Sequence, residues 1–137
     1  MATTITYSRD EQYEIKDGGV IAAATTMEVG QSGGVYILTA AAGAAITLPT
    51  LKSGLNYRFI VGSAFATTDW TIVSSTDVIE GNAIVAGAHV PAANENTISF
   101  VASAESIGDF VELHCDGTSW FVSGSGVTAG SITFTAP

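Results

Sequence analysis

Apolar and polar residues alternate along most of this chain, and the clearest example is the stretch 109–126, DFVELHCDGTSWFVSGSG. One face of this stretch carries Val111, Leu113, Cys115, Trp120 and Val122. A period of two is typical of strands with one buried face. Between the two halves, Asp116 and Gly117 supply the positive φ that a tight turn needs. The pattern predicts a β-hairpin in which Trp120 is the largest buried side chain.

Short runs of the same kind occur on both sides of this hairpin. The other expected strands cover residues 20–24, 35–39, 45–48, 56–61, 69–73, 77–81, 83–85, 97–101 and 131–135. No run is long enough for a stable helix, and residues 91–96 are expected to form a loop. About ten short strands, spaced roughly 8–12 residues apart, predict an all-β fold, either a β-sandwich or a jelly-roll-like barrel. Without crossover helices, we expect mainly antiparallel pairing.

The composition changes near Gly18-Gly19. Residues 1–19 hold six of the charged side chains, namely Arg9, Asp10, Glu11, Glu14, Lys16 and Asp17. We therefore expect an extended N-terminal arm at 1–19 and a single β-sandwich domain at 20–137. The arm either frays or becomes ordered only against a neighbour, with Ile5, Tyr7, Tyr13 and Ile15 as apolar contacts. No basic and apolar leader of the secretory type is visible in it.

The charge balance excludes several classes of partner. The formal net charge is −9, and only Arg9, Lys16, Lys52 and Arg58 are basic. Nucleic-acid binding depends on clustered lysine and arginine, so we expect no nucleic-acid partner. An anionic membrane is disfavoured for the same reason, and no apolar run approaches the ~20 residues of a membrane span. Cys115 is the only cysteine, which excludes an internal disulfide and favours synthesis in a reducing compartment.

Residues with catalytic or metal-binding chemistry are few and scattered. Gly30–Gly34 matches G-x-S-x-G, but a strand follows it directly, whereas a nucleophile elbow leads into a helix. His114, Cys115 and Asp116 are consecutive, so on a strand they cannot all face one metal. His89 is expected in a loop before Pro91. We expect no catalytic residue, no cofactor, no metal site and no enzyme activity.

Two segments resemble a known class of proteins. VYILTAAAGAAITLPTLKSGLNYRFIV, which follows Gly34, and the later DGTSWFVSGSG are similar to small β-rich virion proteins of tailed bacteriophages. The resemblance covers roughly residues 34–126 and is most like head decoration proteins, also called capsid cement proteins. It implies a non-enzymatic structural protein that binds the outside of a phage capsid and stabilises it. The implied location is the virion surface after synthesis in the host cytoplasm.

The resemblance also suggests partners. The expected partners are the major capsid protein and two further copies in a homotrimer, which suits a three-fold position on a shell. The expected contact residues to the capsid or to a neighbouring protomer are Tyr7, Arg9, Tyr13, Ile15 and Lys16. The alternatives are a tail-fibre or spike module that binds a host receptor or glycan, an unrelated β-domain, and a small depolymerase. Exposed aromatic residues would indicate the first of these, and a pair of carboxylates the last.

Overall fold

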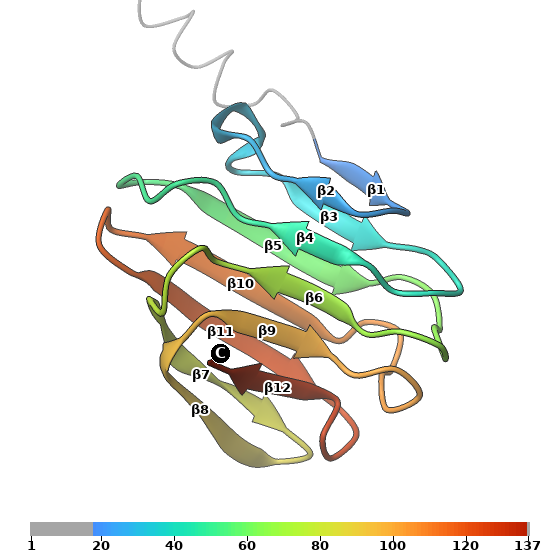
Figure 1. Cartoon of the computed structure of the whole chain (residues 1–137). Helices are drawn as coiled ribbons and strands as arrows, with labels where there is room; N and C mark the ends of the chain where they lie inside the picture. Colours follow the sequence, from blue (N-terminus) through green and yellow to red (C-terminus); the bar gives the residue numbers. More distant parts are fainter. Residues whose placement is uncertain (1–17, 137) are drawn as a thin grey trace, which may run out of the picture.

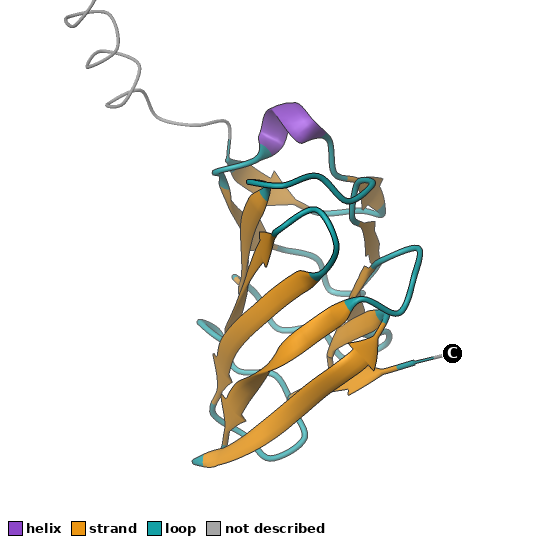
Figure 2. Cartoon of the chain, turned by 90° about the vertical axis from the view of Figure 1, so that its left-hand side faces the viewer, coloured by secondary structure: helices purple, strands orange, loops and turns teal. Residues whose placement is uncertain are grey.

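Two β-sheets face each other in the computed structural model, which describes residues 18–136 (Figure 1). The seven-stranded sheet, in spatial order, contains β1 (Gly19–Ile21), β3 (Val35–Leu38), β5 (Asn56–Val61), β10 (Phe110–Cys115), β11 (Trp120–Gly126), β7 (Ile79–Val85) and β8 (Ala88–Glu95). The five-stranded sheet contains β12 (Ile132–Thr135), β9 (Thr97–Phe100), β6 (Trp70–Val73), β4 (Ala45–Thr47) and β2 (Thr25–Thr26). One short 3₁₀ turn, η1 (Val29–Gln31), follows β2 (Figure 2). The expectation of an all-β sandwich is confirmed.

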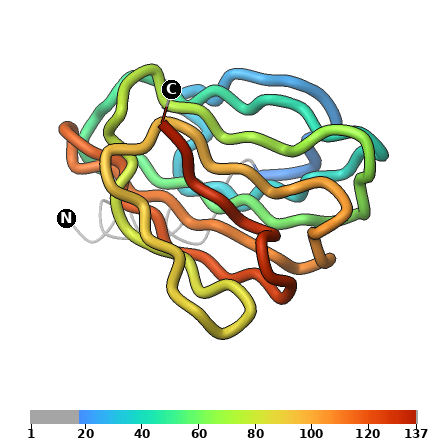
Figure 3. The backbone as a smooth tube through the Cα atoms, turned by 60° about the horizontal axis from the view of Figure 1, so that its bottom comes forward, coloured from blue at the N-terminus to red at the C-terminus, as the bar shows by residue number. Residues whose placement is uncertain are grey.

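Strand pairing is mixed, so the expectation of mainly antiparallel sheets is wrong. β1, β3 and β5 are parallel neighbours in the seven-stranded sheet, and β2, β4 and β6 are parallel neighbours in the other. From β1 to β6 the chain alternates between the sheets, so each crossover between parallel neighbours is itself a strand of the opposite sheet (Figure 3). Parallel strands need a long crossover, but this winding supplies it without a helix.

The segment after β6 also differs from the expectation. Residues 79–85 form one strand, and the expected loop at 91–96 lies largely in its antiparallel partner β8. The turn falls at Ala86 and Gly87, whose φ angles of 51° and 80° are both positive, as two-residue hairpins require. Pro91 is tolerated in β8 because this strand is at the sheet edge, where a missing N–H removes no ladder bond. His89 is therefore in a strand and not in a loop.

The hairpin of β10 and β11 forms as expected. Gly117 has a φ of 95°, and the Asp116 side chain accepts hydrogen bonds of 2.8 Å from the backbone N–H groups of Thr118 and Ser119. These hydrogen bonds lower the pKa of Asp116 because they favour its charged form, and the bond from Ser119 has the largest effect. The exposed turn is thus fixed by one carboxylate.

The core lies between the inner faces of the two sheets. Phe59, Trp70, Ile72 and Trp120 are fully buried, and the ring centroids of Tyr57 and Trp120 are 6.0 Å apart. The inward face expected for the stretch 109–126 is confirmed in β10 and β11, and β5, β6 and β9 also turn large apolar side chains inward. Cys115 is a buried free thiol in this core.

Trp120 and its neighbour Phe121 give a matched test of this packing. Trp120 is fully buried, whereas Phe121 is 46% exposed on the opposite face of the same strand. Trp120→Ala should lower the free energy of unfolding by about 3–5 kcal/mol, because it leaves a cavity. Phe121→Ala should lower it by less than ~1 kcal/mol. Chemical denaturation measures both values, and equal losses for the two variants would contradict this assignment of faces.

Candidate functional site

The outer face of the seven-stranded sheet carries a row of apolar side chains, which we call the apolar row. It consists of Val20, Ile37, Ile60, Phe110 and Ile84. Strand register places Val20 beside Ile37, Ile37 beside Ile60, and Ile60 beside Phe110. Ser125 separates Phe110 from Ile84. Val20 is 66% and Ile84 47% exposed, although outward positions of a solvated sheet are normally polar.

A small polar cluster adjoins the apolar row. The Arg58 guanidinium lies 4.3 Å from the centre of the Phe110 ring, and its Nη1 is 3.7 Å from Glu112 Oε2. His114 Nε2 is 3.1 Å from Glu112 Oε1. These side chains are partly exposed, so the ion pairs contribute little to stability. They do place a basic group beside an acidic one, which leaves the centre of this face close to neutral.

The apolar row was missed by the sequence analysis, which looked for the buried face of each strand. Ile37, Ile60 and Phe110 each occupy the outward position of a different strand. Only the register between strands brings them together. The available signal was an apolar residue at a position where alternation calls for a polar one, repeated in several strands.

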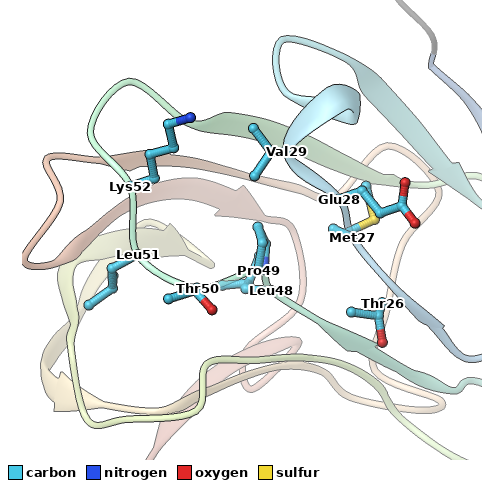
Figure 4. Close-up of a pocket in the computed structure, with 9 residues that line it drawn as sticks. All are labelled: Thr26, Met27, Glu28, Val29, Leu48, Pro49, Thr50, Leu51 and Lys52. Atoms are coloured by element: carbon cyan, nitrogen blue, oxygen red, sulfur yellow. The ribbon is translucent and has the colours of Figure 1, made fainter.

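A groove lies at the end of the sandwich where η1 and the segment after β4 diverge (Figure 4). Its volume is about 640 Å³, and it is lined by Thr26, Met27, Glu28, Val29, Leu48, Pro49, Thr50, Leu51 and Lys52. Met27 and Leu48 are buried, and Val29 is 47% exposed. The lining is mostly apolar, with Glu28 and Lys52 as its charged members.

Two tyrosines hold η1 in place beside the groove. Tyr57 Oη donates a hydrogen bond of 2.7 Å to the Glu28 carbonyl, and Tyr36 Oη donates one of 2.7 Å to the Gln31 carbonyl. The Glu28 backbone N–H donates to Gln31 Oε1 at 2.8 Å. Burial raises the pKa of Tyr57 to about 12, with smaller contributions from Tyr36 and Cys115. The groove wall is thus anchored to the core.

The serine of the G-x-S-x-G match makes a structural contact. Ser32 Oγ accepts a hydrogen bond of 2.9 Å from the Asn56 backbone N–H. The element before Ser32 is η1 and the one after it is β3, so the strand–turn–helix of a nucleophile elbow does not occur here.

Several acidic side chains hold loops instead of meeting at a site. Asp109 is buried, and its carboxylate accepts hydrogen bonds from the backbone N–H groups of Ser106 and Val127 at 2.9 and 3.1 Å. The carboxylate of Asp69 accepts one from Ala102 at 2.8 Å. Within residues 18–136, no three His, Cys, Asp or Glu side chains gather in a way that could hold a metal ion.

The contact residues expected from the sequence, Tyr7, Arg9, Tyr13, Ile15 and Lys16, lie outside the described residues. In the part that the structure describes, no helix has the length and apolar character to cross a membrane.

Comparison of the chain with protein-family models, with curated proteins and with solved structures finds no match.

Tyr57 should make stability depend on pH at the alkaline end. An unfolded tyrosine ionises near pH 10, whereas folded Tyr57 ionises near pH 12. The contribution of Tyr57 to the free energy of unfolding is therefore fully present below pH 10 and is lost as the pH rises toward 12. At pH 7, Tyr57→Phe should cost about 0.5–1.5 kcal/mol, because the hydrogen bond to Glu28 is lost.

Urea denaturation at pH 7, 10 and 11.5 tests this. The difference between wild type and Tyr57→Phe should shrink above pH 10. A constant difference would mean that Tyr57 titrates normally.

Metal chelators and reducing agents should leave thermal stability unchanged. Cys115 is buried and is the only cysteine of the chain, and no metal cluster occurs in the described part. Scanning calorimetry with excess EDTA, and separately with dithiothreitol, measures this. A clear drop in melting temperature with EDTA would point to a ligand set that involves residues 1–17.

Proposed function

We propose that the protein is a non-enzymatic virion structural protein that binds the outside of a phage capsid and stabilises it. The observation that carries this proposal is the apolar row on the outer face of the seven-stranded sheet. The resemblance of residues 34–126 to phage virion proteins supports the proposal independently. It is most like head decoration proteins, which is why we propose the capsid shell as the partner.

The shape and charge of this face suit a protein partner. Six inter-strand spacings of about 4.8 Å make it about 29 Å wide. A standard interface buries about 800 Å² on each partner. A face of this width can provide a large part of that area. The apolar row is interrupted only by Ser125, and neighbouring apolar side chains on an outer face are typical of interaction surfaces. Arg58 on β5 is paired in register with Glu112 on the neighbouring strand β10. A partner that covers the centre of this face therefore meets no uncompensated charge there.

Other parts of the proposal rest on expectations about assembly. A homotrimer at a three-fold position would present three such faces to the shell. The arm residues Tyr7, Arg9, Tyr13, Ile15 and Lys16 would add contacts to the capsid or to a neighbouring protomer. The net charge of −9 keeps free copies apart before they bind.

A tail-fibre or spike module that binds a receptor or glycan is the second candidate. Phe121 is 46% exposed, and strand register places it beside His114 and Glu80. An exposed ring flanked by hydrogen-bonding groups suits the stacking of a sugar. Binding of the pure protein to a glycan array, lost in Phe121→Ala, would favour this candidate over the shell.

Binding to undecorated particles should depend on the apolar row. Ile84→Asp and Val20→Asp each place a carboxylate in the proposed contact, and should weaken co-sedimentation with such particles by about ten-fold or more. Ile107→Asp changes a residue that is 71% exposed in the loop between β9 and β10, and should leave binding unchanged. Equal binding by all three variants would exclude this face as the docking surface. Failure of wild type to bind particles would exclude the function itself.

A further inference from the structure

We propose that the groove beside η1 receives the opposite end of a second copy of this chain, so that copies associate head to tail. The residues that enter the groove are Ile107 and Val127, which we call the apolar tip. They are 71% and 72% exposed, more than any other large apolar residue in the described part of the chain. The groove has a volume of about 640 Å³ and is lined mostly by apolar residues, which suits it to receive apolar side chains.

The apolar tip and the groove lie at opposite ends of the sandwich. The groove is at the end where β2 and β4 finish, and β6, which is parallel to β4, finishes there at Val73. β9 runs in the opposite direction and ends at Phe100. Ile107 follows β9, and Val127 precedes β12, which begins opposite Phe100. Figure 1 shows η1 and the loop after β4 at the left, and the two loops of the apolar tip at the right.

One buried carboxylate holds the two loops of the apolar tip together. Asp109 is 2% exposed, and its carboxylate accepts hydrogen bonds from the backbone N–H groups of Ser106 and Val127 at 2.9 and 3.1 Å. The Asp109 N–H donates to the Ser106 carbonyl at 3.0 Å, which closes a turn whose third residue, Gly108, has a φ of 99°. Ile107 is thus presented on a fixed turn, so less conformational entropy is lost when it enters a groove.

The charges of the two surfaces are compatible, although the whole chain carries −9. Residues 106–108 and 127–130 contain no charged side chain, and the groove contains one acidic residue, Glu28, and one basic residue, Lys52. The contact therefore brings no like charges together.

The size of the contact decides when it forms. Insertion of two side chains belongs to the class of weak interfaces that bury less than about 1,200 Å². Repulsion between copies that carry −9 then keeps the dilute protein monomeric. Attachment to a common surface would hold copies side by side and raise their local concentration to the millimolar range, where a weak contact forms.

Head-to-tail contacts of this kind are heterologous, and they close into a ring when the rotation between copies allows it. A ring of three would be the homotrimer of the proposed function. The contact leaves the apolar row free, so attachment of a single copy to the shell does not need it, and Ile107→Asp still docks. The inference rests on the proposed function for the place where copies meet, whereas the contact itself can be measured on the free protein.

Photo-crosslinking of the free, full-length chain at millimolar concentration tests the contact. Ile107 is replaced by p-benzoylphenylalanine in an equal mixture of heavy-isotope-labelled and unlabelled protein, so that links between copies carry both isotopes. We expect links from position 107 to peptides of another copy that contain residues 26–29 or 48–52. Links from one tip to another, links only to other regions, or no links between copies would overturn the proposal.

Two valines provide matched variants for this experiment. Val127 in the apolar tip and Val20 on the outer sheet face are 72% and 66% exposed, so neither substitution disturbs the core. Val127→Asp should reduce the cross-link yield by about ten-fold, because it places a carboxylate in an apolar contact. Val20→Asp should leave the yield unchanged. Equal yields in the two variants would contradict the head-to-tail contact.

The groove side has its own matched pair. Val29 in the groove and Ile84 on the outer sheet face are both 47% exposed. Val29→Asp should lower the yield by about ten-fold and Ile84→Asp should not. Raised salt should increase the yield of the otherwise unchanged chain, because screening weakens the repulsion between copies. A yield that falls with salt would indicate an ionic contact and contradict an apolar one.

Failure of this inference and failure of the proposed function give different results. If the links form and the protein does not bind particles, the head-to-tail contact stands and the capsid function falls. If particles bind the protein and no links form between copies, the capsid function stands and the head-to-tail contact falls.

Discussion

The two sheets must cover each other, because the described part of the chain contains no α-helix that could cover either one. This requirement explains why the chain alternates between the sheets from β1 to β6: every crossover adds a strand to the opposite layer. It also explains the row of large buried side chains between the layers, with Phe59 and Trp120 on one sheet and Trp70 and Phe100 on the other. Burial of these side chains is the main source of stability in such a sandwich.

Because the inner faces of the two sheets form the core, the outer faces are available for other roles. The seven-stranded sheet places apolar residues from five strands in one row, with Arg58 and Glu112 as neighbours. The groove at the end of the sandwich is a separate apolar surface, positioned by Tyr36 and Tyr57 through η1. The protein thus carries two distinct apolar surfaces outside its core, one on a sheet face and one at the end of the sandwich.

Much of the fold could be predicted from the alternation of residues. The faces of β5, β6, β10 and β11 follow from their period of two, and the turn at Asp116-Gly117 follows from its residue types. Parallel pairing could not be predicted, because parallel neighbours are usually joined through helices, whereas here strands of the opposite sheet make the crossovers. The β7–β8 hairpin was missed because Ala86 gives no turn signal and Pro91 suggests a loop. The apolar row depends on register between strands distant in sequence, which a single strand does not reveal.

The most direct test of the central claim is cryo-electron microscopy of the parent particle with and without this protein. The account predicts additional density on the outside of the head, at symmetry axes, that fits the sandwich with Val20, Phe110 and Ile84 toward the shell. Density at the tail, or a sandwich that faces the shell with its five-stranded sheet, would contradict it.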